Sequence, residues 1–238
     1  ADLWDSGRVE SSRQNQIEYE GLASVSFRRH FWKLCVWDET GATSGWSAVS
    51  EWTSGVLMPS DWEAEWIARA RMPVLSGPLP RFRKTFTTKR PVTRAILYSS
   101  GLGFHEVFLN GRKVGDEVLS PLWTNYRKTV FYVAHDVTEL LQAGENAIGA
   151  ELGNGFYNVA GGRYVKFVGS FGTLMLKAMI RMEYDDGTVD CVGTNQDWKA
   201  STGPTVFSCI HGGEDYDERL EQPGWSEIGF DDSEWGWC

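Results

Sequence analysis

SGLGFHEVFLNGRKVGDEVLSPLWTNYRKTVFYVAHDVTELLQAGENAIGAELGNGFYN, residues 100–158, is the stretch that decides the fold. Three apolar runs in it, Phe104 to Leu109, Val130 to Ala134 and Ile148 to Leu152, are too short for ordinary helices and predict β-strands. Asn110-Gly111 follows the first run and is a strong signal for a two-residue hairpin turn, because a type I′ turn needs positive φ at both central residues. Asp136 can cap one helical turn that ends near Gly144.

Further strands are expected on both sides of this stretch. In the strongest of them, Thr173 to Tyr184, five apolar side chains face one way: Leu174, Leu176, Ala178, Ile180 and Met182. Asp185-Asp186-Gly187 then turns the chain into a second hairpin. The other predicted strands are 81–87, 95–99, 188–192 and 206–210. With 26 glycines and few segments at helical spacing, the chain is predicted to be all-β.

The first 57 residues are expected to form a separate unit. Ser26 to Trp37 alternates in side-chain character as a sandwich strand does, and Gly45 opens another strand that ends near Gly55. Only part of a sandwich is readable here, and half a sandwich would leave core faces exposed. Residues 58–66 are predicted to be a linker, and residues 67–238 a second domain.

Two motifs resemble a known family. FLNGRKVG, followed by LSPLWTNYRKTVFYVAHDVTELLQAGENAIGAELGNGFYN, is similar to the N-terminal β-sandwich domain of bacterial α-L-rhamnosidases, and 1–57 resembles the later strands of a fibronectin type III-like domain. The resemblance implies a partial fibronectin-like sandwich followed by a jelly-roll-like, galactose-binding-like β-sandwich. It also implies a bacterial source, and it favours a secreted or periplasmic location over a cytoplasmic one.

Composition excludes several classes of protein. The net charge is −9, and residues 141–238 carry 6 basic and 16 acidic side chains, a balance that argues against nucleic-acid binding. No run reaches the ~18 apolar residues of a membrane span. The four cysteines show no metal-binding spacing, and buried free thiols are favoured over disulfides. The start at Ala1 and the end at Cys238 suggest a processed product or a fragment.

Gly153-Asn-Gly-Phe-Tyr157 is the first candidate binding loop. Two glycines permit a tight turn that projects the Asn154 amide outward beside two aromatic rings. The resemblance places the ligand face of the sandwich near this loop, so Asn154 and Tyr157 are the first candidate sugar ligands. The alternative is an ordinary turn at a strand end, with Phe156 in the core.

Gly213 to Glu221, the densest acidic segment, is the second candidate. Glu214, Asp217 and Arg219 offer groups for sugar hydroxyls, and Tyr216 offers a ring face for sugar C–H groups. The carboxylates are also candidate ligands for Ca²⁺, although the spacing is not that of an EF-hand, and related rhamnose-binding modules use calcium. The alternative is a solvated surface loop. Trp123, in a predicted loop, is a further candidate for stacking on a sugar.

The predicted function is that of a non-catalytic N-terminal fragment of an α-L-rhamnosidase. The resemblance implies a parent enzyme that releases terminal α-L-rhamnose with acids on an (α/α)₆ barrel, and no residue here resembles that barrel or its acidic motif. Its partners would be a rhamnose-containing glycan and the barrel. A free-standing carbohydrate-binding module and a purely architectural domain without a ligand remain alternatives.

Overall fold

A computed structural model describes residues 2–70, 77–162 and 166–238. The chain divides into two compact units, Ala1–Trp62 and Glu63–Cys238. The border between them lies inside the segment predicted as a linker.

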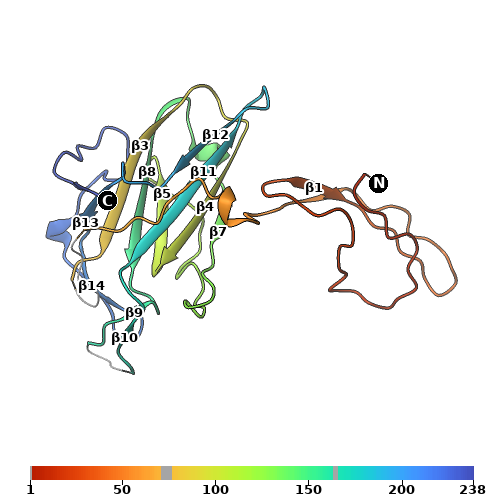
Figure 1. Cartoon of the computed structure of the whole chain (residues 1–238), viewed down its shortest axis with the longest axis horizontal. Helices are drawn as coiled ribbons and strands as arrows, with labels where there is room; N and C mark the ends of the chain where they lie inside the picture. Colours follow the sequence, from red (N-terminus) through yellow and green to blue (C-terminus); the bar gives the residue numbers. More distant parts are fainter. Residues whose placement is uncertain (1, 71–76, 163–165) are drawn as a thin grey trace. The chain divides into compact units, whose positions relative to one another are not determined.

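The larger unit is a sandwich of two antiparallel sheets, which Figure 1 shows face to face. One sheet has the order β12-β11-β4-β7, and the other has the order β16-β13-β3-β8-β5-β6. Their strands are β3 (Pro80–Thr88), β4 (Arg94–Leu102), β5 (Phe104–Leu109), β6 (Arg112–Lys113), β7 (Val133–Asp136), β8 (Gly144–Gly153), β11 (Met175–Glu183), β12 (Val189–Gly193), β13 (Lys199–Thr202) and β16 (Gly236–Trp237). The prediction of an all-β sandwich is confirmed.

The core lies between the two sheets. The five apolar side chains predicted to face one way, Leu174 just before β11 and Leu176, Ala178, Ile180 and Met182 within it, are all 1% exposed or less. Phe82 of β3, Ile148 of β8 and Leu109 of β5 belong to the same cluster. Alternation along the strands therefore selects the core residues correctly.

The hairpin turn follows its predicted chemistry. Asn110 and Gly111 have φ of 50° and 79°, and they join β5 to β6. The Asn110 amide also donates to the carbonyl of Leu140, at 2.9 Å, so the turn is tied to the short helix η2 (Thr138–Leu140). Asp136 accepts from the Thr138 amide at 3.0 Å, but the residue at the N-cap of η2 is Val137, and the helical turn ends at Leu140 and not near Gly144 as predicted.

One strand prediction in this unit is shifted. Val130 to Ala134 was expected to be a strand, but β7 covers Val133–Asp136 and pairs with β4 through Ala134 and Tyr98. Before Val133 no described residue of the run forms a strand pair with β4, although the Ser100 hydroxyl donates to the Phe131 carbonyl at 2.8 Å and the Tyr132 ring lies 6.1 Å from the Tyr98 ring. The apolar run thus begins in the loop that precedes the strand.

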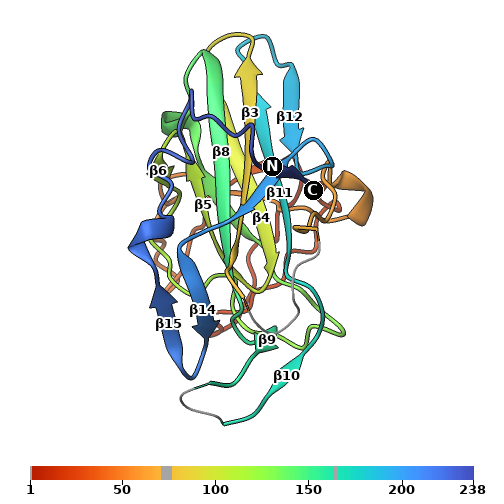
Figure 2. The same cartoon turned by 90° about the vertical axis from the view of Figure 1, so that its left-hand side faces the viewer.

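Two short strand pairs lie at the same end of the sandwich, as Figure 2 shows. One pair is β9 (Asn158–Val159) with β10 (Gly169–Ser170), and the other is β14 (Thr205–Cys209) with β15 (Gly213–Tyr216). The helical turn η3 (Glu218–Leu220) follows β15. Both predicted binding loops belong to this end.

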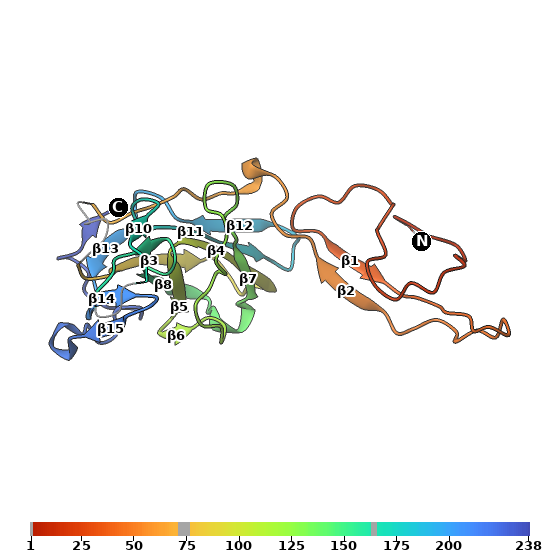
Figure 3. The same ribbon diagram turned by 90° about the horizontal axis from the view of Figure 1, so that it is seen from below.

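The smaller unit contains the antiparallel pair β1 (Arg29–Trp32) and β2 (Ser50–Thr53), which Figure 3 shows among long loops, and it ends with the helical turn η1 (Pro59–Asp61). The predicted strand from Ser26 to Trp37 is therefore too long. Beyond Trp32 the ladder of strand pairs ends, and isolated backbone hydrogen bonds follow, such as the one from the Ser47 amide to the Leu34 carbonyl, at 2.8 Å. Among described residues 2–62, no hydrophobic side chain is buried.

All four cysteines are free thiols in the structure, and Cys209 is buried. Burial raises the pKa of Cys191 and of Cys238 to about 12, so both stay protonated near neutral pH. In the described ranges, no helix is long and apolar enough to cross a membrane.

Candidate functional site

A pocket of about 330 Å³ opens beside the β9–β10 pair, a size that suits a small ligand. Its walls come from the segment before β3, the end of β4, the loop before β7 and the β9–β10 region. The described lining residues are Trp66, Leu102, Tyr126, Arg127, Val130, Tyr157, Ser170 and Phe171.

Three aromatic rings form one wall of this pocket. The ring centres of Tyr126 and Tyr157 lie 5.2 Å apart at 89°, and Phe171 stacks on Tyr157 at 5.9 Å and 30°. Burial raises the pKa of both tyrosines above the usual phenol value, so the hydroxyls remain neutral. Gly172 has φ of +143°, and a Cβ there would lie 3.0 Å from the Tyr157 Oη, so this close approach of the chain to the ring favours glycine.

The Asn154 amide points into the protein and not outward as predicted. Its Nδ2 donates to the carbonyl of Ser208 on β14, at 2.8 Å, and the residue is 5% exposed. Gly155 has the expected positive φ of 53°, but its Cβ position lies 3.0 Å from the Phe104 ring, so the turn packs against β5. Asn154 thus ties the loop to the β14–β15 hairpin.

Trp123 lies on the surface at the same loop. Its ring is 63% exposed and stacks on Phe156, with centres 4.9 Å apart and planes at 27°. Phe156 in turn meets His211, in the β14–β15 turn, edge to face at 5.9 Å. The structure therefore brings Trp123 to the loop that carries Asn154 and Tyr157.

The acidic segment is an exposed hairpin strand with paired side chains. Asp217 binds Arg219 at 2.6 Å through Oδ2 and Nη2, and the hydrogen bonds from Arg219 lower the Asp217 pKa. The Tyr216 hydroxyl donates to Glu221, and this bond raises the Tyr216 pKa. Glu214 is exposed on β15. Most of these groups already have partners within the hairpin, so sugar binding there stays a prediction.

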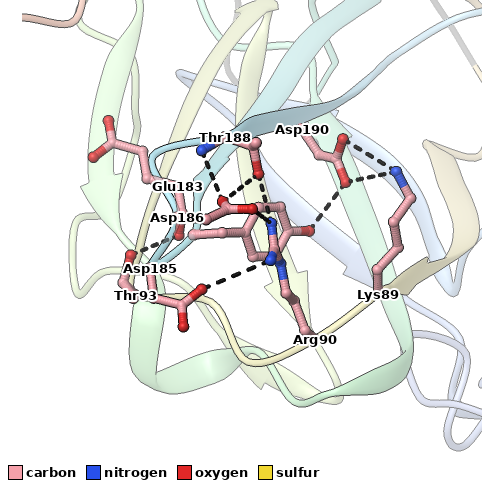
Figure 4. A network of polar contacts seen from close by, with 9 residues as sticks. Lys89, Arg90, Thr93, Glu183, Asp185, Asp186, Thr188 and Asp190 are labelled. Carbon is pink, nitrogen blue, oxygen red and sulfur yellow. Dashed lines mark hydrogen bonds and ion pairs between the residues drawn. The ribbon is translucent and has the colours of Figure 1, made fainter.

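A densely charged cluster elsewhere in the unit has a structural role. Figure 4 shows Arg90, from the β3–β4 turn, between Asp185 and Asp186 of the β11–β12 turn, with Lys89 beside Asp190. The hydrogen bonds from Thr188 and Arg90 lower the Asp186 pKa to about 2. Each carboxylate of Asp185, Asp186 and Asp190 has a cationic partner, so the cluster joins two turns and offers no free ligand group.

No group of three or more His, Cys, Asp or Glu side chains that could hold a metal ion occurs among residues 2–70, 77–162 and 166–238. Of the carboxylates predicted as calcium ligands, Asp217, which follows β15, is paired with Arg219, and Glu214 lies exposed on β15. The donor set therefore gives no support to a calcium site there.

Sequence reasoning missed Tyr126, Arg127 and Phe171. The Asn125-Tyr-Arg-Lys128 run was available as a signal, since it places an aromatic ring next to a guanidinium in a predicted loop. Nothing in the sequence shows that the Phe171 ring lies 5.3 Å from the Tyr126 ring, because the two residues are 45 positions apart in the chain.

Comparison with known proteins gives two family matches. Residues 90–237 match the model of the alpha-L-rhamnosidase N-terminal domain, and residues 1–58 match that of the Rha78A-like N-terminal immunoglobulin domain. An alpha-L-rhamnosidase of Formosa agariphila is 36% identical over 100% of this chain and 28% of its own length.

Solved structures agree with these matches. The alpha-L-rhamnosidase from Dictyoglumus thermophilum superposes with a TM-score of 0.88 at 36% identity, over 99% of this chain and 27% of that one. The Streptomyces avermitilis alpha-L-rhamnosidase, solved with L-rhamnose, has a TM-score of 0.90 at 23% identity, over 99% of this chain and 39% of that one, and shows the shared fold. The chain spans about a quarter of the length of the curated relative above. With the family model matching more than half of its residues, the chain belongs to the alpha-L-rhamnosidase N-terminal domain family.

Proposed function

We propose that this chain is the non-catalytic, sugar-recognising N-terminal part of an α-L-rhamnosidase. The observation that carries the proposal is the aromatic pocket of Tyr126, Tyr157 and Phe171 in a chain of this family. The parent enzyme would release terminal α-L-rhamnose, and its catalytic acids would lie on a separate barrel that packs against this region.

The chemistry of the pocket suits a sugar ring. Pyranoses present apolar C–H faces and polar rims, so a site for them combines aromatic walls with a few hydrogen-bonding groups. The tyrosine rings and Phe171 supply the walls, and the Arg127 guanidinium and Ser170 hydroxyl supply polar groups at the rim. L-Rhamnose also has a methyl group, which an aromatic wall can cover.

The other six candidate ligand residues are not among the described residues that line the pocket. Trp123 offers an exposed ring beside the same loop, as an extension of the site for a longer glycan. Glu214, Tyr216, Asp217 and Arg219 form a second candidate surface on the hairpin. Asn154 holds the loop against β14 through the hydrogen bond from its side-chain amide to the Ser208 carbonyl.

A calorimetric titration of the chain with L-rhamnose tests the proposal. We expect saturable binding that is lost in Tyr157→Ala and kept in Trp237→Ala, a control at an aromatic residue outside the described pocket lining. The titration is run with calcium and again with chelator, so that a metal requirement is detected. Absence of heat at millimolar sugar in both buffers would contradict the proposal.

An architectural domain without a ligand is the second candidate. It is favoured by the internal pairing of Asp217 with Arg219 and of Tyr216 with Glu221, which leaves these predicted ligands engaged. A domain of this kind would give no heat with any sugar and would have its role in packing against the barrel.

A further inference from the structure

The aromatic pocket has an unusual charge for this protein. Of its described lining residues, Arg127 carries the only formal charge. The whole chain has a net charge of −9, so a positive pocket is not a consequence of overall composition. The positive charge of the pocket therefore comes from the residues that line it.

Arg127 has no carboxylate within ion-pair distance among the described residues, whereas Arg81, Arg83 and Arg90 each have at least one. It is exposed, and its guanidinium lies 6.0 Å from the centre of the Phe171 ring. A guanidinium next to an aromatic wall offers a planar set of N–H donors to a ligand in the pocket.

The sequence around the pocket is also depleted in acids. Residues 95–105, which contain Leu102, have no Lys, Arg, Asp or Glu, and residues 118–135, which contain Arg127, have two basic and no acidic side chains. Residues 152–182, which contain Tyr157 and Phe171, have four basic side chains and again no acidic one. The three segments that supply all of the described lining except Trp66 therefore contain no acidic side chain to neutralise Arg127, while Trp66 follows Glu65 in the sequence.

We propose that this pocket takes an acidic sugar unit, a uronic acid, in the glycan that the protein recognises. The inference rests on the proposed function, since it names the class of sugar for the same site. The aromatic rings of Tyr126, Tyr157 and Phe171 cover the pyranose ring, and Arg127 binds the carboxylate through two parallel N–H donors. The Ser170 hydroxyl, which donates to Asn158, accepts from a ring hydroxyl.

The experiment compares D-glucuronate with D-glucose by calorimetric titration at fixed ionic strength. The two sugars differ only in the group at C6, so the ratio of their dissociation constants isolates the carboxylate. We expect glucuronate to bind roughly tenfold more tightly or better, as a charge-assisted bidentate contact provides. Glucose 6-sulfate is the third ligand, because a sulfated sugar offers the same negative charge with a different geometry.

Arg127→Gln and Lys128→Gln are the matched variants. Arg127 and Lys128 are adjacent in the sequence and both are exposed, so each substitution removes one positive charge from the same region. Only Arg127 lines the pocket. We expect Arg127→Gln to abolish the preference for glucuronate over glucose and Lys128→Gln to change it less than about twofold. Arg127→Lys keeps the charge and is expected to retain only part of the preference, because an ammonium cannot make the bidentate contact.

Equal affinity for glucuronate and glucose, or equal losses in the two glutamine variants, would overturn the inference. Glucose 6-sulfate binding as tightly as glucuronate would also overturn it, in favour of a site for any anionic sugar. If L-rhamnose binds and glucuronate has no advantage, the inference fails and the proposed function stands. If glucuronate binds and L-rhamnose does not, sugar recognition at this pocket and the inference both stand, and only L-rhamnose as the ligand of the pocket is wrong.

Discussion

Asn154 and Tyr157 lie three residues apart in one loop and have different surroundings. The Asn154 amide is directed inward and donates to Ser208, whereas the Tyr157 ring forms part of the pocket wall. The glycine pattern around Asn154 predicts the turn correctly, with positive φ at Gly155. It does not predict the direction of the amide, which depends on β14, more than 50 residues further along the chain.

Asn154→Ala should lower the stability of the larger unit. It removes the partner of the buried Ser208 carbonyl, and an unsatisfied buried group costs about 1–3 kcal/mol. Urea denaturation measures the change in the free energy of unfolding. Asn15→Ala, at an exposed position, is the control and should change it by less than about 0.5 kcal/mol. Equal effects of the two substitutions would show that the hydrogen bond from the Asn154 side chain to Ser208 contributes nothing to stability.

His105 should make stability depend on pH. Burial, and to a lesser degree His135, lowers the His105 pKa from 6.5 to about 4, and its Nε2 lies 2.9 Å from the Ser99 Oγ. Below pH 6.5 the unfolded chain binds a proton at this residue that the folded chain excludes. Stability is therefore fully present above pH 6.5 and is lost as the pH falls towards 4, by at most about 3 kcal/mol.

His105→Gln removes the imidazole that binds this proton and leaves the other titratable groups of the chain in place. The difference in unfolding free energy between wild type and variant should consequently shrink between pH 7 and pH 4. Chemical denaturation at four pH values across this range measures it. A difference that stays constant with pH would contradict the assignment.

At the level of elements, β11 shows what alternation predicts and β1 shows where it fails. Both have apolar side chains on defined faces. The β11 side chains Leu176, Ala178, Ile180 and Met182 are buried because β3, β5 and β8 supply an opposing sheet. The run from Ser26 to Trp37 has no such sheet among the described residues of its unit, so Phe31 and Leu34 remain 62% and 44% exposed. Alternation in the sequence identifies the apolar face of a strand, but that face is buried only where another sheet packs against it.

Leu176→Ala in β11 should destabilise the sandwich by about 2–5 kcal/mol, the cost of removing a fully buried leucine. Leu220→Ala, in η3, makes the same chemical change at a residue that is 45% exposed and should cost much less. Thermal or urea denaturation of both variants gives the comparison. Similar losses would mean that the inner face of β11 does not form the core.

At the level of the whole molecule, the two units should differ in local stability. The larger unit has an extensive core, whereas the only buried side chains described in residues 2–62 are His30 and Ser54. The His30 ring stacks on Trp52 across the β1–β2 pair, with centres 4.1 Å apart, and this contact holds the strands together with few others. Local opening is easiest where buried apolar contacts are few.

Hydrogen exchange followed by mass spectrometry should therefore show rapid exchange in residues 2–62 and slow exchange in β4, β8 and β11. The expected difference in protection is at least about a hundredfold, as for segments whose opening free energies differ by about 3 kcal/mol. Equal protection in the two units would show that the smaller unit has a core that its side-chain exposure does not reveal.

The most direct test of sugar recognition is a nuclear magnetic resonance titration of the labelled chain with L-rhamnose. We expect saturable shifts of the amides in 126–130, 157–159 and 170–172, the segments that contribute residues to the aromatic pocket. Shifts confined to 214–219 would move the site to the β14–β15 hairpin. An unchanged spectrum at saturating sugar would contradict the claim that this unit recognises the sugar at all.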